Sequence, residues 1–266
     1  MGTDSGVDWT TNTWGPWRGC RKVSTGCKFC YAEADFKRYG RGPFSTVTRA
    51  ARQTFRAPLG RTRSGAWRWA DGAFVFCPVW SDWFIEEADP WRSEAWDIIA
   101  QRPGLRFQIL TKRIERAGAC LPEDWHGGYG NVWLGTSVEH QATAHRLDVL
   151  ATLRARVRFA SVEPLLGPVK LPSLEALDWL IVGGESGVNA RPCDADWIRD
   201  VIAQGDAAGV PVFVKQLGAR FHDADQGLGG RLNRDLPERL RSHKGSDPAE
   251  WPADLRRREL PAGFTL

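Results

Sequence analysis

The chain has 266 residues, of which 42% are hydrophobic and 26% are charged. This is the composition of a globular protein and excludes an intrinsically disordered chain. The formal net charge of +4 is too small to require a polyanionic partner. No apolar run approaches the roughly 20 residues of a membrane-spanning helix, and the first residues lack the basic and apolar regions of a signal peptide. We therefore expect a cytoplasmic protein with no membrane partner.

Short apolar runs alternate with helical stretches along most of the chain. Runs rich in Val, Ile, Phe and Trp predict six strands, at residues 74–79, 105–110, 132–135, 157–160, 179–182 and 211–214. Apolar residues at helical spacing predict three helices, over residues 91–99, 144–151 and 194–209. Asp194 and Gly209 would be the N-cap and the C-terminal stop of the last helix. This alternation predicts an α/β fold with parallel strands and helical crossovers.

The end of the chain has a different character. Residues 219–266 show no clear period, and they contain the glycine-rich stretch 227–230 and a charged stretch that reaches Leu266. We expect an irregular extension there, packed on a barrel domain of residues 1–218.

Polar side chains follow every predicted strand. The candidate site residues among them are Asp82, Lys112, Ser137, Glu139, Ser161, Glu163, Gly183, Gly184, Glu185 and Lys215. In parallel α/β barrels the active site lies at the C-terminal ends of the strands, so these residues occur where such a fold builds a site. The alternative is that they simply end strands, although they mix acids, bases and hydroxyls instead of the usual turn-forming residues.

Three of the six cysteines lie close together, as Cys20, Cys27 and Cys30 in a C-x6-C-x2-C pattern. Clustered thiols in a reducing compartment favour metal or redox chemistry over disulfides. A structural zinc site usually needs four ligands, often from two C-x2-C pairs, and only one such pair is present. Three thiolates suit a [4Fe–4S] cluster with one iron left open for a substrate or cofactor. Buried or redox-active thiols without a metal are the third interpretation.

Several blocks of the sequence resemble known families. The segment 27–30, Cys-Lys-Phe-Cys, resembles the second half of the radical S-adenosylmethionine motif, although the first spacing is six residues instead of the usual three. Further blocks resemble a widely distributed family of unknown function that was first named from phage proteins and is marked by a three-cysteine motif. These blocks occur in order at residues 19–33, 110–113, 131–139, 161–167, 179–187 and 213–218.

The radical S-adenosylmethionine resemblance implies a partial (βα)6 TIM-like barrel with a [4Fe–4S] cluster on Cys20, Cys27 and Cys30. S-adenosylmethionine would bind the open iron, and an electron from a donor such as flavodoxin or ferredoxin would break its sulfonium bond. The resulting radical would abstract hydrogen from a substrate. A nucleic-acid base or nucleotide is the substrate we expect, because residues 49–68 are rich in Arg, the pI is about 8.8 and the family is associated with phage.

Roles for the strand-end residues follow partly from the same resemblance and partly from the chemistry of their side chains. The segment 183–185, Gly-Gly-Glu, resembles the element that grips the amino group of S-adenosylmethionine, although here it follows a late strand. The lysines would suit a carboxylate or phosphate, and the acids would bind ribose hydroxyls or move protons. We expect the catalytic residues to be Glu185, Glu163, Lys112 and Asp82. We expect the cofactor-binding residues to be Gly183, Gly184, Glu185, Ser137, Glu139, Ser161 and Lys215.

Two other functions stay open from the sequence. One is a nucleic-acid-binding module with a structural metal and no turnover, whose binding would weaken steeply with salt. The other is a barrel hydrolase or nuclease with a metal held by carboxylates, drawn from Asp82, Glu139, Glu163 and Glu185. The second alternative leaves the three clustered cysteines without a role.

Overall fold

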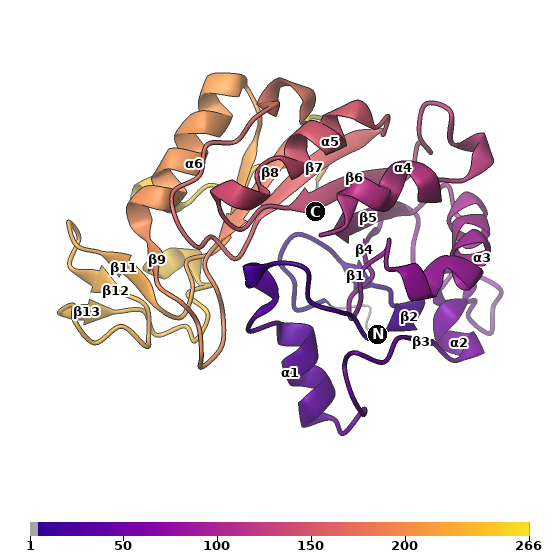
Figure 1. Ribbon diagram of the computed structural model, residues 1–266, viewed down its shortest axis with the longest axis horizontal. Helices are drawn as coiled ribbons and strands as arrows, with labels where there is room; N and C mark the ends of the chain where they lie inside the picture. The colour runs from indigo at the N-terminus through magenta and orange to yellow at the C-terminus, as the bar shows by residue number, and fades with distance from the viewer. Residues whose placement is uncertain (1–4, 266) are drawn as a thin grey trace.

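A seven-stranded parallel sheet, curled into a half-barrel, forms the centre of the computed structural model, which describes residues 5–265 (Figure 1). The strands pair in chain order, and their bounds are β1 Asn12–Thr13, β4 Phe74–Cys77, β5 Arg106–Thr111, β6 Val132–Ser137, β7 Val157–Val162, β8 Trp179–Gly183 and β10 Val212–Gln216. Every pair is parallel. The predicted α/β, partial TIM-like barrel is confirmed, and all six predicted strands are present, with ends that differ by no more than two residues.

The strand that the sequence does not predict is β1. It has only two residues, Asn12 and Thr13, and no apolar run marks it. It pairs with β4 through the register Asn12↔Val75 at one edge of the sheet. The segment that carries the three cysteines begins directly after it, so this segment leaves from the C-terminal end of the first strand of the half-barrel.

The helices of the second half of the chain cover the outer face of the sheet, whereas the first helix extends away from it (Figure 1). The α-helices are α1 Tyr31–Arg38, α2 Arg52–Phe55, α3 Asp89–Ala100, α4 Ala117–Cys120, α5 Arg146–Thr152 and α6 Ala195–Ala208. Short 3-10 helices lie between them, at Thr25–Cys27, Ala57–Leu59, Glu86–Ala88, Ile114–Arg116, Glu123–Trp125, Gln141–Thr143, Leu174–Ala176, Pro248–Glu250 and Ala253–Leu255. In the described part of the chain, no helix has the length and apolarity needed to cross a bilayer.

The predicted caps of the last helix are confirmed. The side chain of Asp194 accepts a hydrogen bond from the backbone N–H of Asp196, and Gly209 ends α6 in the left-handed conformation, with φ of 68°. These residues satisfy backbone groups that a helix end would otherwise leave unpaired. The helix therefore begins and ends where the local sequence specifies.

Aromatic side chains fill the lower part of the inner face of the half-barrel. Trp9 lies among them, with its ring centroid 4.9 Å from that of Phe76 and 6.2 Å from that of Trp179. The other buried members of this cluster are Phe74, Trp133, Val157, Phe159, Ile181 and Phe213. Alternate residues of a strand face the same way, so the face that carries these rings continues toward polar side chains at the C-terminal strand ends.

The C-terminal extension is largely irregular, as expected, but it also contributes short strands to a small sheet that the sequence does not predict. Its strands are β9 Cys193–Asp194, β11 Phe221–Asp223, β12 Leu228–Gly229 and β13 Glu238–Arg239, in the order β13-β12-β11-β9. Strands of two or three residues leave no readable apolar period, and their pairing depends on β9, which lies outside the extension in the sequence. The small sheet therefore forms only by joining the barrel.

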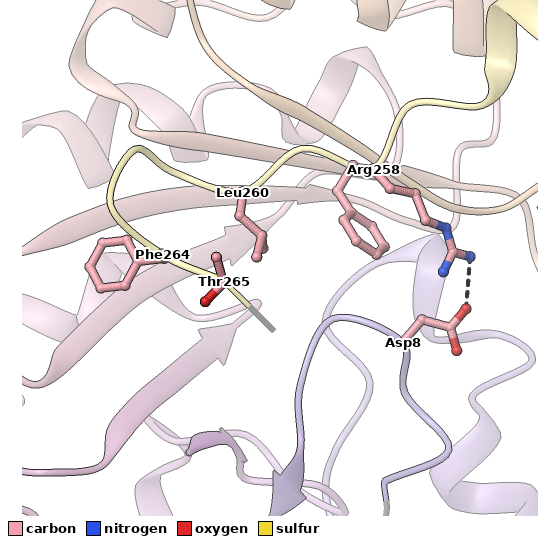
Figure 2. Close-up of a pocket in the computed structure, with 6 residues that line it drawn as sticks. Asp8, Arg258, Leu260, Phe264 and Thr265 are labelled. Atoms are coloured by element: carbon pink, nitrogen blue, oxygen red, sulfur yellow. Dashed lines mark hydrogen bonds and ion pairs between the residues drawn. The ribbon is translucent and has the colours of Figure 1, made fainter. Parts of the chain in front are cut away.

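The last residues of the chain cover the open edge of the half-barrel. The backbone N–H of Val214 donates to the carbonyl of Arg257, and that of Glu259 donates to Val212, so this segment runs beside β10. An ion pair of 2.8 Å between Arg258 and Asp8 joins it to the N-terminal segment. Figure 2 shows this pair beside a cavity of about 400 Å³ that Leu260, Phe264 and Thr265 help to line. A covered edge does not offer unpaired backbone groups to other chains.

Candidate functional site

The three-cysteine loop, defined here as residues 14–30, lies across the C-terminal ends of the strands. Its first half is fixed to the segment that follows β4. The indole N–H of Trp17 donates to the carbonyl of Asp82 at 2.9 Å, and the hydroxyl of Ser81 donates to the carbonyl of Gly19 at 2.5 Å. The loop is therefore fixed at the mouth of the half-barrel, where the sequence predicts a site.

Arg113, just past the end of β5, holds the part of the loop around Cys20. Its guanidinium lies 3.6 Å from the sulfur of Cys20 and donates to the carbonyl of Arg21 at 2.9 Å. Asp82 lies 3.4 Å from Arg113 and accepts hydrogen bonds from the hydroxyl of Thr111 at 2.6 Å and the backbone of Lys112 at 2.8 Å. These contacts give Asp82 a positioning role, because it orients the cation that touches Cys20.

Glu139, just past the end of β6, holds the part of the loop around Cys27. It accepts a hydrogen bond from Ser24 at 2.8 Å, and the Ser24 hydroxyl lies 3.8 Å from the sulfur of Cys27. Gly26 packs so closely against Glu139 that a Cβ at this position would overlap the glutamate side chain. The residue before Cys27 must therefore be glycine if the loop is to approach the strand end this closely.

The carboxylate of Glu139 is fully buried and is held by cations. Arg146 lies 3.1 Å from one oxygen and Lys112 lies 3.4 Å from the other. Burial opposes ionisation of the carboxyl, but the two cations and the Ser24 hydroxyl together keep the pKa of Glu139 below its usual value. Glu139 is therefore a charged centre that links a strand end, a helix and the loop.

Glu185, just past the end of β8, holds the loop through Arg191. It accepts two hydrogen bonds from the Arg191 guanidinium, at 2.8 and 2.6 Å, and a third from its backbone at 2.9 Å. Another nitrogen of the same guanidinium donates to the carbonyl of Thr25 at 2.8 Å. The two glycines before Glu185 have a packing reason, since a Cβ on Gly184 would collide with the carbonyl of Leu217.

Glu163 and Lys215 form an ion pair at the mouth. The Lys215 ammonium lies 2.7 and 2.8 Å from the two oxygens of the carboxylate, and both side chains keep some contact with solvent. Ser137 and Ser161 are buried opposite each other in the register of β6 and β7. The predicted strand-end residues thus gather at one end of the sheet, although most have partners within the protein.

A protein-family model matches residues 4–248, which is most of the chain. The chain belongs to the family described as protein of unknown function DUF5131. No curated protein and no solved structure matches this chain. The DUF5131 match includes the three cysteines and all ten strand-end candidates, and it ends inside the C-terminal extension.

The thiols of this DUF5131 protein fit a [4Fe–4S] cluster in donor type and setting. All three are free and half-buried. Burial raises the pKa of Cys20 to about 12 and also raises the pKa of Cys30. Arg113 and Lys112 supply positive charge beside the sulfurs, which would offset the negative charge of thiolates bound to iron.

A single metal ion makes a different demand, because its ligands must converge on one point. In residues 5–265, no three His, Cys, Asp or Glu side chains converge in this way. Thiolates of a [4Fe–4S] cluster bind different irons, so that arrangement is not required for a cluster.

Sequence reasoning missed two site residues, Ser24 and Arg191. Ser24 lies within the C-x6-C spacing and Arg191 lies six positions after Glu185, but neither is a predicted ligand, and the contacts that link them to the site join Ser24 to Glu139 across 115 positions and Arg191 to Thr25 across 166. Only the fold brings such groups together, so no local signal identifies them.

Proposed function

We propose that this DUF5131 protein is an iron–sulfur enzyme that binds a [4Fe–4S] cluster through Cys20, Cys27 and Cys30 and uses S-adenosylmethionine as the source of a radical. The observation that carries the proposal is the fixation of a three-thiol loop across the C-terminal ends of parallel strands. Three separate strand ends hold this loop, through Arg113, Glu139 and the Glu185–Arg191 pair. Polar contacts from several elements keep a loop in one conformation, which a loop that binds a cofactor needs.

The carboxylates at the mouth also favour this function over a hydrolase with a carboxylate-bound metal. Each of the four acids that such an enzyme would use already pairs with a cation, as Asp82 with Arg113, Glu139 with Arg146, Glu163 with Lys215 and Glu185 with Arg191. A carboxylate that shares its charge with a guanidinium or ammonium is a poor ligand for a second cation. Among the contacts of residues 5–265, the cation within hydrogen-bond distance of these thiols is Arg113, which contacts Cys20.

When bound, a cluster of this type supplies the electron that breaks a carbon–sulfur bond of S-adenosylmethionine, after reduction by a donor such as flavodoxin or ferredoxin. The residues of the chain would do the rest. Arg113 and Lys112 would offset negative charge beside the thiolates. Glu163 and Lys215 would bind polar groups of the cofactor or substrate and hold a proton. The aromatic cluster around Trp9 would keep water from the inner face below.

The test is a metal analysis followed by spectroscopy. The chain would be purified without oxygen, assayed for iron, sulfide and zinc, reduced, and examined by electron paramagnetic resonance with and without S-adenosylmethionine. We expect about four irons and four sulfides per chain and a signal that shifts when S-adenosylmethionine is added.

Single variants sharpen this test. Cys20→Ala, Cys27→Ala and Cys30→Ala should each lose most of the iron. Cys120→Ala is the matched control, because Cys120 is also free and partly buried but lies in α4. Zinc in place of iron, or equal iron in the Cys27 and Cys120 variants, would end the proposal.

A further inference from the structure

A second cavity, of about 380 Å³, lies in the C-terminal extension. Three arginines line it, Arg231, Arg234 and Arg239, together with Leu232 and Leu240. The three arginines and Leu232 are exposed, whereas Leu240 is buried. The cavity therefore has a cationic rim over an apolar floor.

The charge on this rim is not neutralised within the protein. In the part of the chain that the structure describes, no carboxylate lies within ion-pair distance of Arg231, Arg234 or Arg239, whereas the nearby Arg241 pairs with Glu250 at 3.0 Å. Like charges brought together without a counter-ion repel one another. An anion in the cavity would relieve this repulsion, and the apolar floor would strengthen its attraction.

The backbone that carries the three arginines is held in place. The side chain of Asn233, which is buried, donates to the carbonyl of Phe221 at 3.0 Å and accepts from the backbone N–H of Asp235 at 3.1 Å. This pins the turn that carries Arg231 and Arg234. Arg239 lies on β13, which pairs with β12 through Gly229↔Arg239. Because this backbone is fixed, binding of an anion costs the ordering of the arginine side chains but not of the segment that carries them.

The extension that holds this cavity is bonded to the mouth of the half-barrel. The backbone N–H of Ala219 donates to the carbonyl of Glu185 at 2.9 Å, and that of Leu217 donates to Gly245 at 2.8 Å. In the view of Figure 1, the strands β11 to β13 and the indigo segment that carries the cysteines both lie on the lower side of the half-barrel. The cavity therefore belongs to a segment that is fixed to the candidate site.

We infer that the cavity lined by Arg231, Arg234 and Arg239 binds a phosphate group of the substrate. The planar guanidinium fork matches the oxygens of a phosphate, and three such forks suit a phosphodiester or a terminal phosphate. The anion site itself does not depend on the iron–sulfur proposal, but its assignment to the substrate rests on that proposed function. A nucleic-acid strand and a mononucleotide share the phosphate, and the experiment separates them.

The experiment measures binding of a fluorescein-labelled single-stranded 12-nucleotide DNA and its RNA counterpart to the full chain by fluorescence anisotropy, at several salt concentrations. The test variant is R231Q/R234Q/R239Q. The control variant is R154Q/R156Q/R256Q, which removes the same charge from exposed arginines that lie outside the Arg-rich segment 49–68 and for which the structure gives no ion pair. Arg154 and Arg156 precede β7 and so lie at the end of the sheet opposite the mouth.

We expect the test variant to bind about tenfold or more weakly than the control, with a slope of log K against log salt reduced by about 2, since each lost contact to a single strand removes about 0.7. The thermal unfolding midpoint of both variants checks folding, and the single variant R234Q provides a milder change. If AMP displaces the strand from the wild type, and its own binding falls in the test variant alone, the site takes a nucleotide. Equal binding of the oligonucleotides and of AMP by test and control variants would overturn the inference.

Protein with and without the reconstituted cluster would be compared. If the protein takes up no iron on reconstitution but its binding of the oligonucleotides still depends on the three arginines, the anion site is supported while the proposed enzyme function fails. If the protein holds the cluster but its binding of the oligonucleotides and AMP does not depend on the three arginines, the anion site fails while the proposed enzyme function stands.

Discussion

Replacing Glu139 by Gln tests whether this residue is the centre that fixes the three-cysteine loop. Glu139 is fully buried and faces Arg146 at 3.1 Å and Lys112 at 3.4 Å. Glutamine keeps the size and can still accept the Ser24 hydrogen bond, so the change removes the charge and little else. Removing one partner of a buried ion pair typically costs about 3–5 kcal/mol. Because Arg146 also donates to the carbonyl of Ser137 at 2.9 Å, we expect a loss near the lower limit, about 3 kcal/mol.

The assay is thermal unfolding of Glu139→Gln beside Asp196→Asn. Asp196 pairs with Arg199 at 3.0 Å on the surface, where an ion pair contributes no more than about 1 kcal/mol. For a chain of this size, 3 kcal/mol corresponds to a fall in Tm of roughly 6–12 °C. A second readout is the rate at which iodoacetamide alkylates Cys27 in the metal-free protein, which should rise when the loop loses its anchor. If the two variants lose equal stability and the alkylation rate is unchanged, Glu139 does not hold the loop.

Three further predictions concern the sheet and its edge. Trp9→Ala should lower the free energy of unfolding by about 3–5 kcal/mol in chemical denaturation, because it empties the centre of the inner aromatic cluster. Gly184→Ala should cost about 1–3 kcal/mol in the same assay, because its Cβ would collide with the carbonyl of Leu217. The hydrogen bond from Arg257 lowers the pKa of Asp206, so the stability that this pair contributes is present above the unfolded pKa of about 3.9 and is lost as the pH falls through the lower folded pKa. Asp206→Asn should remove this part of the pH dependence of Tm.

Each of these predictions has an outcome that would contradict it. Wild-type stability in Trp9→Ala would mean that the ring does not fill the half-barrel. An unchanged Gly184→Ala protein would show that β8 and β10 can separate there without cost. Identical profiles of Tm against pH for Asp206→Asn and the wild type, between about pH 5 and 3, would exclude a contribution from the Arg257 pair.

The strands of the half-barrel follow from the sequence because their signals are local. Each run of apolar residues specifies a buried strand by itself, and the polar residue after it marks the end that forms the mouth. The same holds for α6, whose caps Asp194 and Gly209 act on backbone groups within a few residues. The spacing of Cys20, Cys27 and Cys30 is likewise visible without the fold.

The partners of the strand-end residues do not follow from the sequence. The sequence predicts that Glu139 and Glu185 bind a cofactor. In the structure, Glu139 instead contacts Ser24 and Arg146, and Glu185 contacts Arg191. A charge at a strand end predicts a polar contact but not its identity, because several cations lie within a few positions and Ser24, 115 positions away, also competes for Glu139.

The sequence by itself determined the class of the fold, the order of its main strands and the loop that carries the thiols, because apolar period, helix caps and cysteine spacing act over a few residues. Only the tertiary structure decided the rest. It formed β1 and the small C-terminal sheet from strands too short to have a period, and it buried Trp9 inside the half-barrel. It also joined Thr25 to Arg191 across 166 positions. Such contacts depend on the packing of the whole chain, which no short segment of the sequence encodes.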